Sequence, residues 1–168
     1  MACVRQGDWL IDSRSPSDGD SLSQDISLHL PQRISMGPTL ILADNPRVFL
    51  SVVRKRLARI AAAVEYRRCQ TMDKRKRAGL GQELSLLRTT HFSAKPDRLY
   101  PDGVLVIAPE SVGLELHSFR TIYITTQLLD SQLEFLLQRL APNGVLVTYG
   151  PWPRHYSATI DQYTNLSP

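Results

Sequence analysis

The stretch of the chain that decides its fold is residues 121–149, TIYITTQLLDSQLEFLLQRLAPNGVLVTY. Its first six residues are rich in β-branched side chains and predict a strand. A helix is predicted from Ser131 to Leu140, with a capping-box pattern at 131–134, and Ala141-Pro142-Asn143-Gly144 ends it. Val145 to Tyr149 predicts a second strand. A strand, a helix and a strand in this order are typical of a unit with parallel strands.

Two earlier runs extend this pattern toward the N-terminus. Residues 39–43 and 104–108 are continuously apolar, which is typical of strands buried on both faces of a parallel sheet. Between them, Asn45 is expected to be an N-cap and Pro46 the first helical residue. The following helix carries an apolar stripe, which consists of Phe49, Val53, Leu57, Ile60 and Val64. The sequence therefore predicts a three-layer, Rossmann-like α/β domain with a mainly parallel sheet.

We expect this domain to span residues 39–150. Residues 1–38 are expected to be an irregular lead-in with one or two short strands, at Trp9 to Ile11 and in the alternating residues 26–30. Residues 151–168 are expected to be a polar tail. Two points in the middle stay open. Residues 61–66 can extend the first helix or form a strand, and a second predicted helix at 73–88 is weakened by two glycines.

Composition places the chain among soluble single-domain proteins. Its 168 residues are 42% hydrophobic with a formal net charge of +4, and no apolar run is long enough to span a membrane. Two cysteines are too few for a disulfide framework, so a cytoplasmic location is expected. The four histidines are widely spaced, so no metal site is predicted.

The charge is concentrated in residues 47–77, here called the basic stripe. This segment holds 11 basic and two acidic residues, whereas the rest of the chain holds nine basic and 14 acidic residues. Such segregation is typical of a surface for nucleic acid or an acidic protein. The residues expected to contact a polyanion are Arg54, Lys55, Arg59, Arg67, Arg68, Lys74, Arg75, Lys76 and Arg77. The alternative is a solvated helix face, neutralised by the acidic N-terminal segment.

A second candidate site lies where the predicted strands end, because ligands of open α/β sheets bind beyond the carboxyl ends of the strands. The residues that follow these strands and form the expected pocket are Asp44, Asn45, Glu110, Thr126 and Gln127. Glu110, Glu115 and His117 are candidates for acid–base chemistry if their loop folds inward. The alternative is that Asp44 caps a helix and the glutamates are exposed loop charges. No catalytic residue is assigned.

Residues 119–148 resemble the later half of class I S-adenosylmethionine-dependent methyltransferases. The resemblance rests on the strand at 119–126, the helix after it, and Leu140-Ala141-Pro142-Asn143-Gly144 before the next strand. It implies a methyl-donor site in a Gly-rich loop early in the fold. The comparable string here, residues 79–84 (GLGQEL), lacks the third glycine and follows a basic run where a strand is needed. No cofactor is therefore predicted.

A second likeness is to the C-terminal lobe of superfamily 2 helicases. The strand at 104–108, then Val112-Gly113-Leu114-Glu115, then Gln138-Arg139 follow the order of that lobe's late motifs. Leu140 to Pro142 stand where the second arginine is expected, and the sequence has no phosphate-binding loop of the GxxxxGK[ST] type. The likeness implies a degenerate lobe, not a working motor.

We therefore expect a non-catalytic α/β binding or accessory module that engages nucleic acid or an acidic protein through the basic stripe. Two alternatives remain. One is a divergent nucleotide- or S-adenosylmethionine-dependent transferase with its site at the strand ends. The other is a structural subunit of a larger complex. Whether the chain is an enzyme is left open, with the balance against it.

Overall fold

The computed structural model describes residues 2–6, 9–14, 19–95, 103–112 and 118–149. In this part of the chain, seven strands form one sheet in the order β1-β2-β7-β6-β3-β5-β4. The strands are β1 (Ala2–Gln6), β2 (Trp9–Arg14), β3 (Thr39–Leu42), β4 (Phe92–Ser93), β5 (Val104–Ile107), β6 (Phe119–Ile124) and β7 (Leu140–Tyr149). β1 pairs antiparallel with β2, and the other neighbouring pairs are parallel, as the sequence predicts.

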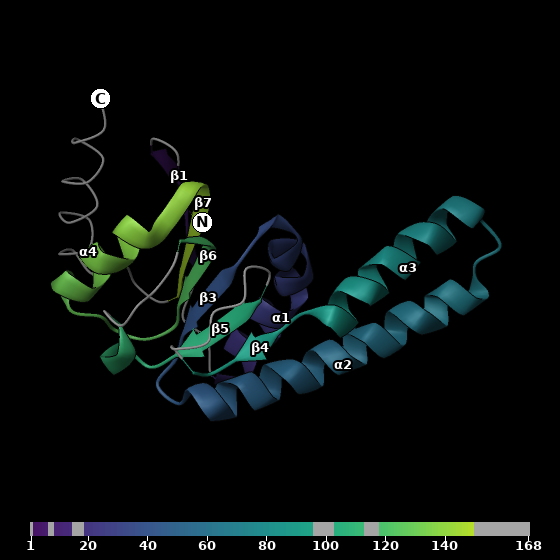
Figure 1. Cartoon of the computed structure of the whole chain (residues 1–168), viewed down its shortest axis with the longest axis horizontal. Coiled ribbons are helices and arrows are strands. Elements are labelled where there is room, and N and C mark those ends of the chain that lie inside the picture. Colours follow the sequence, from purple (N-terminus) through teal and green to yellow (C-terminus); the bar gives the residue numbers. More distant parts are fainter. Residues whose placement is uncertain (1, 7–8, 15–18, 96–102, 113–117, 150–168) are drawn as a thin grey trace.

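Helices cover both faces of the sheet (Figure 1). They are α1 (Gly19–Met36), α2 (Pro46–Gln70), α3 (Lys74–Thr89), the 3-10 helix η1 (Pro109–Ser111) and α4 (Asp130–Arg139). One core cluster joins Ile41 of β3 to buried residues of α1, α2 and α3. A second joins Leu40 and Leu42 of the same strand to α4. Because successive strand residues point to opposite faces, this division makes three layers and confirms the Rossmann-like architecture.

The order of the strands shows where two neighbouring strands connect to opposite sides of the sheet. From β3 the chain passes through α2 and α3 to β4 at one edge of the sheet. From β6, the neighbour of β3, it passes through α4 to β7 on the other side. The carboxyl ends of β3 and β6 are therefore the topological switch point of the sheet, the usual ligand position in open α/β folds.

The N-terminal segment is more regular than the sequence suggests. Trp9 to Ile11 lie in β2, as expected, but the predicted strand at 26–30 is wrong because these residues belong to α1. Ile26, Leu30 and Ile34 are buried at a spacing of four residues, whereas Leu28 is 63% exposed. A spacing of four residues is typical of one helix face. Residues 26–30 alone are too short to show this repeat, so they resemble the alternation of a strand.

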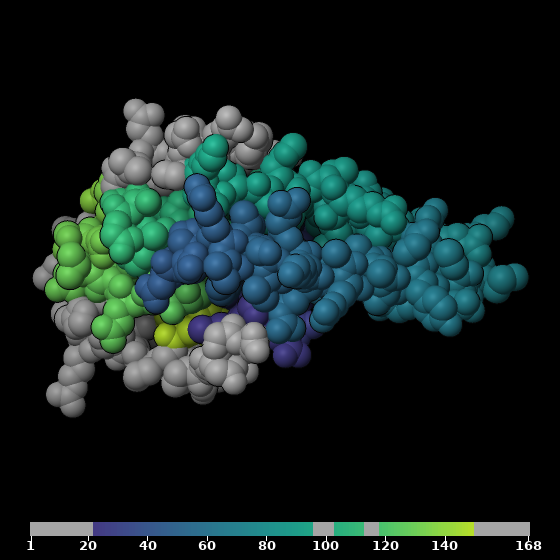
Figure 2. All heavy atoms as spheres, turned by 90° about the horizontal axis from the view of Figure 1, so that it is seen from below, coloured from purple at the N-terminus to yellow at the C-terminus, as the bar shows by residue number. Residues whose placement is uncertain are grey.

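Residues 46–89 form an antiparallel pair of helices that projects from the body of the domain (Figures 1 and 2). Residues 61–66 continue α2, which resolves the open alternative in favour of helix. At 25 residues, α2 is about 37 Å long. Val64 of α2 and Leu84 of α3 are buried in the same cluster, so apolar packing holds the pair together. We call residues 65–77, where the two helices meet, the hairpin tip.

The helix boundaries agree with the sequence in part. Asn45 and Pro46 start α2 as expected, although the Asn45 side chain makes no cap hydrogen bond. The capping box predicted at 131–134 is wrong. α4 begins one residue earlier, and Gln132 Oε1 accepts from the backbone N–H of Leu129 at 2.9 Å. Gln132 Nε2 also donates to Pro109 O at 2.8 Å, which joins α4 to η1.

Candidate functional sites

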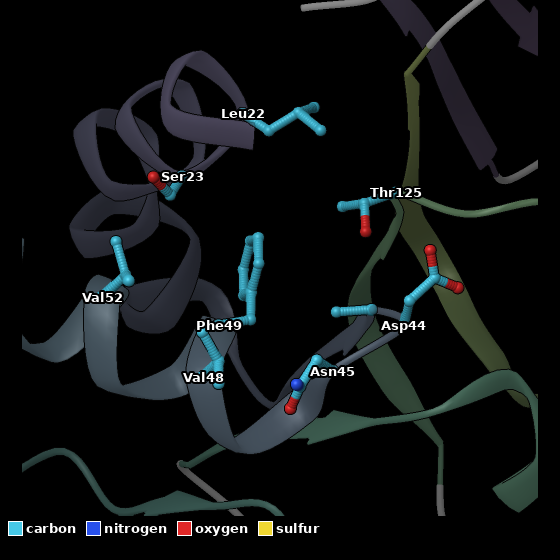
Figure 3. Close-up of a pocket in the computed structure, with 9 residues that line it drawn as sticks. Leu22, Ser23, Asp44, Asn45, Val48, Phe49, Val52 and Thr125 are labelled. Carbon is cyan, nitrogen blue, oxygen red and sulfur yellow. The ribbon is translucent and has the colours of Figure 1, made fainter. Parts of the chain in front are cut away.

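A cavity of about 330 Å³ lies at the switch point between β3 and β6. Its wall consists of the residues that follow β3, the first turns of α2, the start of α1 and the residue that follows β6 (Figure 3). The described residues that line it are Leu22, Ser23, Ala43, Asp44, Asn45, Val48, Phe49, Val52 and Thr125. Ligand sites of open α/β sheets occupy this position.

Two threonines tie the ends of β3 and β6 together at the cavity. Thr125 donates to Leu42 O through its backbone N–H at 3.2 Å and through Oγ1 at 2.6 Å. Thr126 Oγ1 donates to Asp44 Oδ1 at 2.6 Å. The second bond fixes one oxygen of the Asp44 carboxylate, and Oδ2 makes no hydrogen bond to another described residue. The cavity therefore has one oriented acceptor at its rim.

The predicted pocket residues divide into two groups. Asp44 and Asn45 line the cavity, and Thr126 is bonded to Asp44. Glu110 and Gln127 are exposed and are not among the lining residues. Glu110 lies in η1, which follows β5 and not one of the two strands at the switch point. Glu115 and His117 lie outside the described residues.

The apolar wall of the cavity was not predicted. Phe49 and Val52 come from α2, where Phe49 was assigned to the core stripe, and Val48 precedes them. Leu22 and Ser23 come from α1, in the segment expected to be irregular. Figure 3 shows the Phe49 ring directed into the space between α1 and Thr125. The i, i+3 and i+4 spacing of the α2 residues is the only sequence signal for this wall.

The basic stripe forms two surfaces. Along α2, Lys55, Arg59 and Tyr66 recur at intervals of four and seven residues and share the exposed outer face. Arg54 is also exposed, whereas Arg56 and Arg68 are half-buried. The second surface is the hairpin tip. The exposed cations there are Arg67, Lys74, Arg75, Lys76 and Arg77. The predicted polyanion residues thus come together along one projecting element.

The hairpin tip is held by local bonds. Asp73 is the N-cap of α3, and its Oδ1 accepts from the backbone N–H of Arg75 at 2.9 Å and of Lys76 at 3.3 Å. Arg77 donates to Thr71 O at 2.6 Å. Arg68 NH1 lies 3.5 Å from Glu65 Oε2. Hydrogen bonds within the tip therefore define its backbone, and they leave most of its cations unneutralised.

Lys74, Arg75 and Lys76 form no ion pair with any residue that the structure describes. With Arg77 they fill the first turn of α3, which contains no acidic residue. Cations in the first turn of a helix oppose its macrodipole, at a cost of about 0.3–1 kcal/mol each at low ionic strength. Asp73 alone offsets this cost as the N-cap. The cluster is therefore not explained by the stability of α3.

The two N-terminal strands, β1 and β2, lie too far from the hairpin tip to neutralise its positive charge. β1 and β2 occupy the edge of the sheet opposite β4. In Figure 1 the hairpin extends away from the domain on the side opposite β1. Asp12, which lies in β2, is thus separated from the tip by the width of the sheet.

Two apolar side chains are exposed beside these cations. Tyr66, near the end of α2, is 68% exposed, and Met72, between the two helices, is 89% exposed. The sequence reading did not single out either residue. An aromatic ring among arginines offers a face on which a nucleic-acid base can stack.

Neither the glycine-containing segment of α3 nor the potential metal ligands among the described residues form a further site. Residues 79–84 lie inside α3, not in a turn between a strand and a helix, so they do not form a phosphate-binding loop. Among the residues that the structure describes, no group of three or more His, Cys, Asp or Glu is placed to hold a metal ion. None of the described helices combines the length and apolar character that crossing a membrane requires.

Comparison with known proteins gives no family. No protein-family model matches the chain, and no curated protein sequence matches it.

Proposed function

We propose that this chain is a non-catalytic nucleic-acid-binding module and that the hairpin tip is its contact surface. The observation that carries the proposal is the run Lys74 to Arg77, which occupies the first turn of α3 where the macrodipole disfavours cations. Phosphates at this point would relieve both the dipole and the mutual repulsion of the side chains. Binding would also release counterions, which supplies most of the affinity of non-specific complexes.

The composition of the tip favours nucleic acid over an acidic protein. Four of its six basic residues are arginines. A guanidinium group binds phosphate and carboxylate oxygens alike in a bidentate manner, so the arginines suit either partner and the exposed aromatic ring decides between them. Exposed Tyr66 adds a stacking face, which is available to unpaired bases but not to bases inside a duplex. We therefore propose single-stranded RNA or DNA as the ligand.

The shape of the hairpin supports this role. Its tip is narrow and projects from the body, as Figure 2 shows, so a strand can approach it from more than one direction. Lys55 and Arg59 continue the positive charge along α2, toward the body. A strand that contacts the tip can thus extend along the same outer face.

The test is the fluorescence anisotropy of a labelled 15-nucleotide single strand at low salt. We expect saturable binding to the full chain that weakens in Lys74→Ala/Arg75→Ala. The matched control is Arg47→Ala/Arg88→Ala, which removes the same charge from the body end of the same two helices. Circular dichroism verifies that both variants are folded.

Poly-glutamate and a duplex of the same length separate the alternatives. Competition by poly-glutamate as strong as that by the unlabelled strand would favour an acidic protein partner and refute the nucleic-acid assignment. Duplex binding as tight as single-strand binding would refute the role of Tyr66. Equal loss in both double variants would show that only total charge matters and that the tip is not a site.

A further inference from the structure

We propose that the cavity between β3 and β6 is a second, separate binding site, and that its ligand is a nucleoside without phosphate. Phe49 at this cavity and Gln70 at the far end of α2 are 21 residues apart, or about 31 Å along the helix. The site therefore does not depend on the role of the hairpin tip.

Its volume limits the ligand. At about 330 Å³, the cavity lies at the lower end of the roughly 300–1,000 Å³ range of small-molecule sites. A single base with its sugar suits this volume. A dinucleotide does not.

The apolar wall suits a flat ring. Phe49 points into the cavity, with Val52 and Ser23 on one side and Thr125 on the other (Figure 3). A base that enters the cavity can stack against the Phe49 ring and displace water from Val48, which is exposed at present. Burial of apolar surface is the main source of affinity in sites of this kind.

The polar rim requires a ligand that donates hydrogen bonds. The Asp44 carboxylate is an acceptor, and the Thr126 bond orients it through Oδ1 while Oδ2 stays available. The Asn45 side chain forms no cap bond and can also accept from the ligand. A ribose presents two adjacent hydroxyl groups as donors, and acidic side chains bind ribose hydroxyls in this manner in other α/β sheets.

Charge disfavours a phosphate in the cavity, because the partial positive charge of about half a unit at the N-terminus of α2 is smaller than the full negative charge of Asp44. Asp44 is the one charged residue among the described lining residues, and it is negative. A nucleotide would bring its phosphate to a carboxylate without a lysine or arginine in the lining to neutralise it. A nucleoside carries the same base and sugar without this repulsion, which is why we assign the neutral form.

Adenosine is the probe, titrated into the ¹⁵N-labelled full chain and followed by amide chemical shifts. We expect saturable shifts at Val48, Phe49, Val52 and Thr125, with weaker binding of adenosine 5′-monophosphate. Val52→Trp fills the cavity and should abolish the shifts. Ala62→Trp places the same side chain on the exposed face of the same helix and should leave them unchanged.

The Asp44 contact is tested by 2′,3′-dideoxyadenosine, which lacks both hydroxyl groups. It should bind the wild-type chain roughly 10- to 150-fold more weakly than adenosine, because hydrogen bonds to a charged group contribute about 1.5–3 kcal/mol. In Asp44→Ala the difference between the two compounds should shrink to what the Asn45 side chain still contributes. Asp44 is exposed, so this variant is expected to fold even if Val52→Trp does not.

Four results would overturn the proposal. They are no saturable shift at millimolar adenosine, shifts confined to the hairpin tip, full binding by a folded Val52→Trp chain, and equal wild-type affinities for adenosine and its dideoxy form. Tighter binding of the monophosphate than of adenosine would refute the neutral assignment. None of these results would refute nucleic-acid binding at the tip, and shifts confined to the tip would support base stacking there, so the two proposals fail independently.

Discussion

Thr126 Oγ1 donates a 2.6 Å hydrogen bond to Oδ1 of Asp44, across 82 residues of sequence. The two residues follow neighbouring parallel strands, β6 and β3, whose chains leave the sheet in opposite directions. The bond thus links the carboxyl ends of β3 and β6 at the switch point, beside the cavity. It also orients the Asp44 carboxylate, which is one of the two side chains, with Asn45, that we expect to accept hydrogen bonds from the nucleoside.

Removing this bond should lower stability by a measurable amount. Thr126→Val keeps the β-branched shape but loses the hydroxyl, and we expect the free energy of unfolding to fall by about 1 kcal/mol. Thr126→Ser keeps the hydroxyl and should stay closer to the wild type. Urea denaturation measures both. A Thr126→Val chain as stable as the wild type would show that the bond contributes nothing in solution.

Two glycines should respond oppositely to alanine. Gly79 lies inside α3, and beyond its chain neighbours and the backbone of its own helix no described atom lies within 4 Å of the position that a β-carbon would take, so Gly79→Ala should stabilise the chain by about 0.5–1 kcal/mol. At Gly144 a β-carbon would lie 2.6 Å from Ala141 O, so Gly144→Ala should destabilise it by about 1–3 kcal/mol. Thermal unfolding distinguishes the two. Destabilisation by Gly79→Ala would mean that its site is not an open helix surface.

Lys74→Glu should have opposite effects on stability and on binding. An acidic residue in the first turn of α3 interacts favourably with the macrodipole, so the melting temperature should rise. The affinity for single-stranded nucleic acid should fall, because a phosphate contact is replaced by repulsion. Lys74→Gln, which only removes the charge, should be intermediate in both measurements. A lower melting temperature would contradict the dipole argument.

Tyr66→Ala should weaken binding without changing its salt dependence. Stacking of one base contributes about 1–3 kcal/mol, so the dissociation constant should rise roughly five- to hundredfold. Tyr66→Phe keeps the ring and should bind as the wild type does. Anisotropy titrations at several salt concentrations measure both quantities. Equal loss in Tyr66→Ala and Tyr66→Phe would indicate a role for the hydroxyl instead of stacking.

The sequence predicts the sheet well because its central strands are continuous apolar runs. β3 and β5 begin where expected, and the apolar stripe of α2 identifies the helix that follows β3. The order of the strands was not predictable in the same way. β4 has two residues, and the position of β5 beside β3 follows from long-range pairing that leaves no local pattern.

The candidate sites were predictable in part for a related reason. Asp44, Asn45 and Thr126 follow strands, so the strand-end rule finds them. Phe49 and Ser23 reach the cavity from helices on one face of the sheet, and which helix lies beside which strand is a tertiary relationship. The basic stripe was visible in composition. The division of the basic stripe into a helix face and a hairpin tip was not visible in composition, because this division depends on the connection between α2 and α3 at Thr71 to Asp73.

The central claim is that the hairpin tip binds phosphates, and its most direct test is the salt dependence of single-strand affinity. The slope of log K against log salt is about −0.7 for each phosphate contact on a single strand. We predict that Lys74→Ala/Arg75→Ala reduces the magnitude of this slope by about 1.4, which corresponds to two lost contacts. Arg47→Ala/Arg88→Ala should keep the wild-type slope. Equal slopes for the wild type and the tip variant, or equal reductions in both variants, would contradict the account.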